Sequence, residues 1–323
     1  MRDLPPLQTM KPLIVAGNGP SIKNLDYSLF PPDFDVFRCN QFYFEDKYYL
    51  GKEVKGVFFT FGNFDLQMNT AHILHARGEY NFTNFYCSAG KRYICSHYTP
   101  VCTQDFLDRR YVGVRATYNL FEKIEPFFSL YAAHGIFDDQ WITSGVGMLI
   151  CAIALGYEEI YLAGIDFYTD GPGHFYAHKS AYFESPQDNP AHSKELDTKA
   201  IKLAQQYAQL YVLVPNTLLA QILPLSPHKN ALSIETKERL KLGEAKPTDY
   251  IGDVCFIPAH GGYKENIRWL LFKHGMHADN FVFQSLRFGY HVCQDLYQFV
   301  RACLALCTPK NLKLIFKRHK HTR

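Results

Sequence analysis

The sequence predicts an α/β protein with a Rossmann-like, doubly wound and mostly parallel sheet. Short apolar runs recur over roughly the first 215 residues, and two segments with helix caps are interleaved with the later runs. The first run ends in a glycine-containing loop, IVAGNGPS at residues 14–21. Strands that alternate with helices form parallel sheets. A chain of 323 residues can bury the core that this fold needs.

Each strand is predicted from an apolar run bounded by turn residues. The predicted strands are residues 12–16, 34–39, 54–61, 82–88, 158–166 and 210–215. Pro20 suits the first turn of a helix after the first strand. A helix over 143–156 is entered through Thr143-Ser144, and a second runs from Ser193 to about residue 210.

Three further regions flank or interrupt this pattern. Periodicity is lost at about residues 167–192, which predicts a lid segment that orders on ligand binding. We expect an N-terminal extension at 1–11, a main domain at 12–220 and a small C-terminal region at 221–323. The chain ends in NLKLIFKRHKHTR, a basic amphipathic stretch that predicts peripheral contact with an anionic membrane, a frayed solvated terminus being the alternative.

Composition excludes several classes of protein. A net charge of +3 gives no reason to expect a nucleic-acid partner. The nine cysteines form no CxxC pair, which favours a reducing cytoplasm over a disulfide framework. The first ten residues lack the apolar core of a signal peptide, and the longest uncharged apolar stretch, 141–157, is short for a membrane span.

Four polar clusters follow strands or open helices, where ligands bind in a doubly wound sheet. They are residues 17–21 (GNGPS), 40–41 (NQ), 143–145 (TSG) and 164–168 (GIDFY). Glycines in the first cluster permit close backbone approach to an anion. That loop alone is equally compatible with a tight turn, because it lacks the third glycine of a dinucleotide fingerprint and the lysine of a Walker loop. The convergence of four clusters favours a ligand site.

No metal site is expected. Asp33-Phe34-Asp35 matches a DxD string, but it precedes its strand and therefore lies at the opposite edge of the sheet. His174 and His178 are four residues apart, without the glutamate of a zinc protease helix and in a segment broken by Gly and Pro.

His192 directly precedes Ser193, the expected helix cap. The positive end of a helix dipole disfavours imidazolium, so a neutral ring there accepts a proton near pH 7. A capping or surface histidine is the alternative. Tyr168 and Tyr176 bracket the start of the lid, where they either donate hydrogen bonds to a phosphate or pack.

Several motifs together resemble the bacterial sialyltransferases of glycosyltransferase family 42. They are AGNGPS, DVFRCNQFYFEDKYYLG (35–51), ITSG, ALGY, GIDFY and HSK (192–194), and the resemblance is near-continuous over roughly residues 12–220. It implies a variant GT-A fold whose domain at 12–220 binds a nucleotide sugar. It also implies inverting, metal-independent transfer of sialic acid from CMP-sialic acid to a terminal galactose of lipooligosaccharide, with no cofactor. A protein of this kind acts at the inner face of the cytoplasmic membrane, and we expect a homo-oligomer.

The resemblance also implies roles for individual residues. His192 corresponds to the general base, and Tyr168 and Tyr176 to the phosphate-binding tyrosines, although the stretch between them is two residues longer than the family pattern. Asn18 and Asn40 correspond to asparagines that face the nucleotide. The remaining predicted substrate-binding residues are Gly19, Ser21, Gln41, Thr60, Thr143, Ser144, Gly145, Gly164, Ile165, Asp166 and Phe167.

Two departures bear on the acceptor. Trp141 stands where the family often has arginine, and an indole does not replace a guanidinium charge. Thr60 occupies the position at which Asn accompanies added 2,8-activity, so an α-2,3 linkage is favoured over a bifunctional α-2,3/2,8 enzyme. Two other classes stay open from the sequence: a NAD-dependent oxidoreductase, and a non-catalytic sugar-nucleotide-binding protein.

Overall fold

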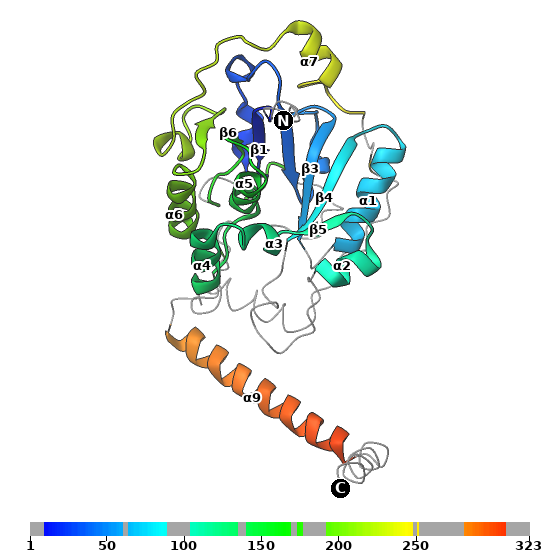
Figure 1. Cartoon of the computed structure of the whole chain (residues 1–323), viewed down its shortest axis with the longest axis vertical. Coiled ribbons are helices and arrows are strands. Elements are labelled where there is room, and N and C mark those ends of the chain that lie inside the picture. Colours follow the sequence, from blue (N-terminus) through cyan, green and yellow to red (C-terminus); the bar gives the residue numbers. More distant parts are fainter. Residues whose placement is uncertain are drawn as a thin grey trace, which may run out of the picture. The chain divides into compact units, whose positions relative to one another are not determined.

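The computed structural model of the chain describes residues 10–60, 64–88, 104–134, 140–168, 173–176, 192–247, 251 and 281–307 (Figure 1). The chain divides into two compact units, Met1–Ala259 and His260–Arg323. The first contains the sheet and every predicted site residue. The domain boundary expected at residue 220 stays a prediction.

The first unit is built on a seven-stranded sheet in which every described pair of strands is parallel. The strands are β1 Leu13–Ala16, β2 Asp35–Cys39, β3 Glu53–Thr60, β4 Asn81–Ser88, β5 Val114–Ala116, β6 Glu159–Ala163 and β7 Gln209–Val212. Their spatial order is β5-β4-β3-β2-β1-β6-β7. The predicted α/β fold is confirmed, as are its six strands to within a few residues; the three-residue β5 was not predicted because so short a run carries no pattern.

The helices of the first unit are α1 Phe64–Ala76, α2 Gln104–Arg110, α3 Tyr118–Phe121, α4 Glu125–Ala133, α5 Ser144–Ala154, α6 Lys194–Ala204 and α7 Ile234–Leu240. Within the described ranges, four short 3₁₀ helices accompany them: η1 Pro20–Asn24, η2 Tyr27–Leu29, η3 Phe42–Phe44 and η7 Leu219–Gln221. Pro20 therefore starts a 3₁₀ helix and not an α-helix. The second predicted helix ends at Ala204, about six residues early, where the backbone amides of residues 205–208 donate to the last carbonyls of the helix.

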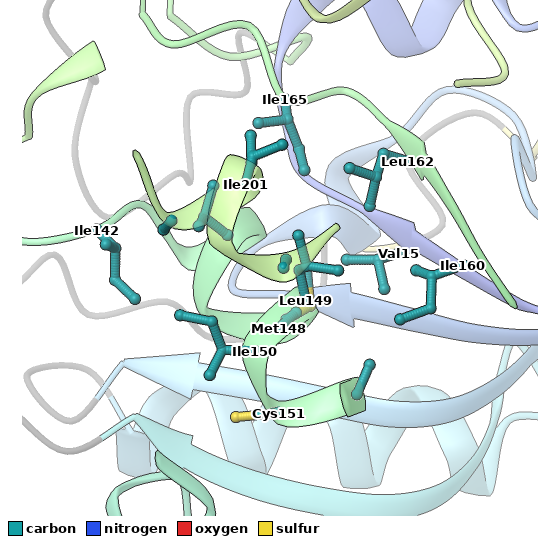
Figure 2. Packing of buried hydrophobic residues seen from close by; sticks show 14 of the residues in the cluster. Val15, Ile142, Met148, Leu149, Ile150, Cys151, Ile160, Leu162, Ile165 and Ile201 are labelled. Carbon is teal, nitrogen blue, oxygen red and sulfur yellow. The ribbon is translucent and has the colours of Figure 1, made fainter. Parts of the chain in front are cut away.

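Alternate residues of β1 separate the core into two layers, as the two-residue period of a strand requires. Leu13 and Val15 pack in a cluster with α5 and α6 on one face of the sheet (Figure 2). Ile14 and Ala16 face the other side and pack with Ile22 of η1. Helix α5 lies against the middle of the sheet and carries an unbroken series of buried residues from Met148 to Ala152.

The direction of strand addition reverses between β1 and β6. From β1 the order runs through β2 to β5 on one side and through β6 to β7 on the other. Loops that leave the carboxyl ends of β1 and β6 therefore diverge and leave a crevice between them, which is the usual ligand position in such sheets.

The described part of the second unit is one helix, α9 Phe281–Leu306. Its large apolar side chains are exposed, including Phe281, Phe288, Leu296, Phe299 and Leu304. Among the described residues, no helix combines the length and apolar character required to cross a bilayer.

Candidate active site

The floor of the crevice is a crossing of two glycine turns. The amide of Gly17 donates to the carbonyl of Ala163 (2.9 Å), and that of Gly19 donates to the carbonyl of Gly164 (2.8 Å). A Cβ atom at Gly17 would overlap the Gly164 carbonyl, and Gly164 itself has φ +61°. The two glycines are thus required by close backbone contact, and the first loop is more than a tight turn.

Asp166 and Ser21 bind each other. The Ser21 amide donates to Asp166 Oδ2 (2.7 Å), and its hydroxyl donates to Oδ1 (2.5 Å). This pair ties the start of η1 to the loop after β6. Asp166 lines the pocket, whereas Ser21 lies behind it as a support.

The two predicted nucleotide-facing asparagines differ in their contacts. Asn40 is fully engaged, because its Oδ1 accepts from the Thr60 amide (3.0 Å) and its Nδ2 donates to Ser144 Oγ (3.0 Å). Asn18 donates through Nδ2 to the Cys39 carbonyl (3.0 Å). Its Oδ1 is buried in the pocket wall without a hydrogen-bond partner among the described residues. A buried acceptor of this kind has a high cost unless a ligand satisfies it.

The loop at the start of α5 is fixed from α6. Thr143 occupies the N-cap position as predicted, but its side chain forms no cap hydrogen bond. Its amide and hydroxyl instead donate to Asp197 at 2.9 and 2.7 Å. Asp197 is fully buried, and burial raises the pKa of its carboxyl to about 7, with the Thr143 hydrogen bonds opposing that shift.

His192 lies at the edge of the crevice. Its Nδ1 is 2.8 Å from the Trp141 carbonyl oxygen. Since a carbonyl only accepts, Nδ1 carries the hydrogen and Nε2 keeps its lone pair. The ring stacks on Tyr168 with centroids 5.4 Å apart and planes 5° from parallel. Ser193 caps α6 as predicted, accepting from the Leu196 amide at 3.3 Å.

Tyr168 is aimed by an unusual backbone. Phe167 and Tyr168 both have left-handed φ angles, +54° and +56°. Consecutive residues in this region are strained, and such strain concentrates at functional sites. The turn buries Phe167 in the core and leaves the half-buried Tyr168 in the pocket wall.

A short segment, Gly173–Tyr176, borders the pocket beside Tyr168. The Phe175 amide donates to the Asn18 carbonyl (2.9 Å), and the Phe175 ring is buried against Tyr49 at 5.8 Å. His174 lines the pocket, while Tyr176 packs on Phe44 at 5.6 Å. Most of the predicted lid, residues 169–172 and 177–191, lies outside the described residues.

The pocket is lined by Gly17, Asn18, Gly19, Cys39, Asn40, Thr143, Ser144, Gly145, Gly164, Ile165, Asp166, Phe167, Tyr168, Gly173 and His174. Thus the four predicted clusters meet. The other predicted residues lie outside the lining. Gln41 is buried, and Thr60 ends β3. Tyr176 stacks on His174 of the lining, and His192 stacks on Tyr168. Cys39, His174 and Asp197 were not predicted as site residues. Asp197 is identified by its hydrogen bonds with Thr143, a contact that the sequence does not reveal.

The histidines of the site are neutral at pH 7. Burial lowers the pKa of His192, with its Trp141 hydrogen bond opposing the shift. Burial, with a smaller contribution from His192, lowers the pKa of His174 to about 4. Burial is therefore the main cause of the neutral His192 that was predicted from the helix dipole.

A family model described as alpha-2,3-sialyltransferase (CST-I) matches residues 11–301. The chain belongs to this sialyltransferase family.

Solved structures agree with that assignment. Monofunctional alpha-2,3-sialyltransferase Cst-I from Campylobacter jejuni is 33% identical, with 85% of this chain and 99% of that chain covered and a TM-score of 0.64. Campylobacter jejuni CstII with the substrate analogue CMP-3FNeuAc is 36% identical, covering 72% and 100%, with a TM-score of 0.61. CST-II with a trisaccharide acceptor and CMP is also 36% identical, covering 80% and 99%, with a TM-score of 0.61.

The sialyltransferase assignment separates the functional classes left open by the sequence. The protein is a glycosyltransferase, and family membership favours this over the oxidoreductase and over a non-catalytic binding protein. Asp33 and Asp35 lie at the amino end of β2, as predicted: Asp33 pairs with Lys11 (2.7 Å), and Asp35 accepts from Tyr157 (2.8 Å). Neither reaches the pocket of the sialyltransferase.

Proposed function

We propose that this sialyltransferase transfers sialic acid from CMP-sialic acid to a terminal galactose of lipooligosaccharide, with inversion and without a metal ion. The observation that carries the proposal is the placement of the His192 ring against Tyr168 at the edge of the pocket, with no hydrogen bond to its Nε2 from any residue that the structure describes. The similarity to structures with CMP-3FNeuAc, and with CMP and a trisaccharide acceptor, supports the donor and acceptor classes.

In this proposal the nucleotide occupies the pocket beside Asn18. Its buried Oδ1 accepts a hydrogen bond from the ligand, which removes the cost of leaving that atom unpaired. Thr143, Ser144 and Gly145 contact the donor sugar and its carboxylate. Asp197 and Asn40 hold this loop from two sides, so it is ordered before the donor binds.

His192 Nε2 accepts the proton of the acceptor hydroxyl as that oxygen attacks the anomeric carbon. General base catalysis of this kind contributes about 10²–10⁴-fold. The Trp141 carbonyl selects the required tautomer, because it holds the hydrogen on Nδ1. Attack on the face opposite the nucleotide gives inversion.

Tyr168 and Tyr176 donate hydrogen bonds to the phosphate of the departing CMP. Burial keeps the pKa of Tyr176 well above its ordinary value, so this phenol keeps its proton for donation. Neutral donors aimed at developing charge perform the role that a metal has in other transferases. This supports metal independence.

The linkage proposal is α-2,3, with a bifunctional α-2,3/2,8 enzyme as the alternative. Thr60, rather than Asn, ends β3 and donates its amide to Asn40. The similarity to a monofunctional α-2,3 enzyme also supports it.

The direct test is incubation with CMP-sialic acid and a panel of galactosides, with excess EDTA in one arm. We expect CMP release, an α-2,3 product by NMR, β-configured donor converted to α-configured product, and equal rates with EDTA. Release abolished by EDTA and restored by Mg²⁺ or Mn²⁺ would contradict metal independence. Transfer to a sialylated acceptor would support the bifunctional alternative, and no CMP release would contradict the donor.

We also propose peripheral contact with the inner face of the cytoplasmic membrane through α9 and the basic residues after it. One side of α9 carries exposed Phe281, Phe288, Val292, Leu296 and Phe299, which fits insertion into a lipid headgroup boundary. The basic tail lies outside the described residues; its cations are Lys310, Lys313, Lys317, Arg318, Lys320 and Arg323. Homo-oligomerisation likewise stays a proposal, to be measured by light scattering.

Vesicle sedimentation tests the membrane contact with matched variants. Phe288→Asp with Phe299→Asp should release the protein from anionic vesicles. Gln294→Asp with Gln298→Asp adds the same charge on the opposite side of α9 and should retain most binding. Equal release by both pairs would assign the effect to charge alone, and no release by either would overturn the role of α9.

A further inference from the structure

His174 is the one histidine of the pocket lining to which no role has been given. It follows Gly173, whose φ is +81°, and precedes Phe175, which is anchored by its amide and its buried ring. Anchoring on both sides fixes the direction of the His174 side chain. It belongs to the stretch between Tyr168 and Tyr176.

The His174 ring lies between the two phenols. It stacks on Tyr176 with centroids 5.2 Å apart and planes 4° from parallel. It meets Tyr168 at 6.0 Å and 76°, so one ring is beside both tyrosines. Among the described residues, no hydrogen bond to either nitrogen of His174 is formed. A ligand that reaches both phenols therefore also reaches an imidazole N–H.

The charge of the pocket makes another neutral donor valuable. Its lining, as far as the structure describes it, contains no lysine or arginine. The only carboxylate in the lining, Asp166, already accepts from Ser21. A phosphate in this pocket is consequently held by neutral N–H and O–H groups, each of which counts more where no cation is present.

We propose that His174 donates an N–H hydrogen bond to the phosphate of CMP and is a further substrate-binding residue of the site. The proposal rests on the proposed function, since it requires CMP in this pocket. The neutral imidazole has one N–H and stays neutral near pH 7, because burial disfavours its charged form. The hydrogen bond strengthens as the phosphate gains charge on departure, so it contributes to donor cleavage as well as to binding.

Three substitutions separate hydrogen bonding from packing. His174→Phe keeps a ring on Tyr176 but removes the N–H. His174→Asn and His174→Gln remove the ring and place an amide N–H near the positions of Nδ1 and Nε2 respectively. We expect His174→Phe to weaken CMP binding by about 10-fold and to slow CMP-sialic acid hydrolysis by at least as much, with one amide variant close to wild type.

Cytidine is the matched ligand, because it lacks the phosphate. Calorimetry should show that His174→Phe weakens CMP but leaves cytidine affinity unchanged. CMP affinity unchanged in His174→Phe would overturn the proposal, as would equal losses in all three variants or parallel losses for CMP and cytidine. Spectra of [¹⁵N]histidine-labelled wild-type protein add a readout that needs no variant: the His174 ring resonances should shift with CMP and not with cytidine.

The wild-type arm separates the two levels of inference. A wild-type protein that binds no CMP and releases none from CMP-sialic acid contradicts the proposed function itself. A wild-type protein that does both, together with a normal His174→Phe variant, contradicts only the role of His174.

Discussion

The first unit contains two clusters of buried polar side chains, which differ in whether their polar groups pair with each other or remain available to a ligand. One is charged: Glu45 accepts from Arg38 (2.9 Å) and Tyr80 (2.6 Å) and lies 3.7 Å from the Lys246 amine. The other lines the pocket and includes His174, Tyr168 and the Asp166 carboxylate. The Glu45 carboxylate contacts both cations of the first cluster, and the backbone around Lys246 forms hydrogen bonds with the loop after β2. The pocket leaves donors and acceptors for a ligand, so it recognises an anion without built-in cations.

The largest effect is expected in the charged cluster. Glu45→Gln keeps the shape of the side chain but leaves Arg38 and Lys246 as buried cations without a carboxylate. Removing one partner of a buried ion pair costs about 3–5 kcal/mol, so the free energy of unfolding in urea should fall by that amount. Glu53→Gln, on the exposed start of β3, should change it by less than about 0.5 kcal/mol. A similar loss of unfolding free energy for both variants would mean that water solvates the charges around Glu45.

The next largest effect is expected for His192→Ala, as a change in the activation barrier of transfer. Transfer should fall by about 10²-fold, or about 2.7 kcal/mol in the barrier, while CMP affinity stays near normal, because the variant removes a proton acceptor and no nucleotide contact. His72→Ala, exposed on α1, is the control. Normal transfer by His192→Ala would return this histidine to a packing role, and equal losses of CMP affinity and transfer would mean that it only maintains the site.

Tyr168→Phe removes one hydrogen bond to the departing phosphate. A hydrogen bond to a charged group contributes about 1.5–3 kcal/mol, so we expect a loss of at least about 10-fold. The loss should appear in both transfer and acceptor-free donor hydrolysis, since both reactions expel CMP. A loss confined to transfer would move Tyr168 to the acceptor side.

The smallest change concerns pH. Burial, with a contribution from Arg38, lowers the pKa of Lys246 to about 7 against the opposing charge of Glu45. Above pH 7 the unfolded chain keeps a proton on this lysine that the folded chain lacks, so the free energy of unfolding rises with pH toward the ordinary lysine pKa. Lys246→Met should lose about 1 kcal/mol of that rise between pH 7 and 8. Lys241→Met, at an exposed pair with Glu244, should keep it, and parallel curves for all three proteins would contradict the shift.

Local signals in the sequence account for the sheet and for most of the pocket. Buried parallel strands are continuous apolar runs, and Gly17, Ser193 and the GIDFY turn each have a local physical cause. Contacts between residues far apart in the sequence have no such local signal. Examples are the hydrogen bonds of Asp197 with Thr143 and the ion pair of Lys246 with Glu45. Helix α9 was not predicted. The position of His174 beside two tyrosine rings depends on ring geometry that the spacing of histidines in the sequence does not reveal.

The position of His192 is set from a distant part of the sequence, residues 141–143. His192 contacts the carbonyl oxygen of Trp141. Two residues after Trp141, Thr143 donates a hydrogen bond to Asp197 of α6. Both anchors belong to the three-residue stretch 141–143. A change that moves residues 141–143 is therefore expected to move His192 and the start of α6 together.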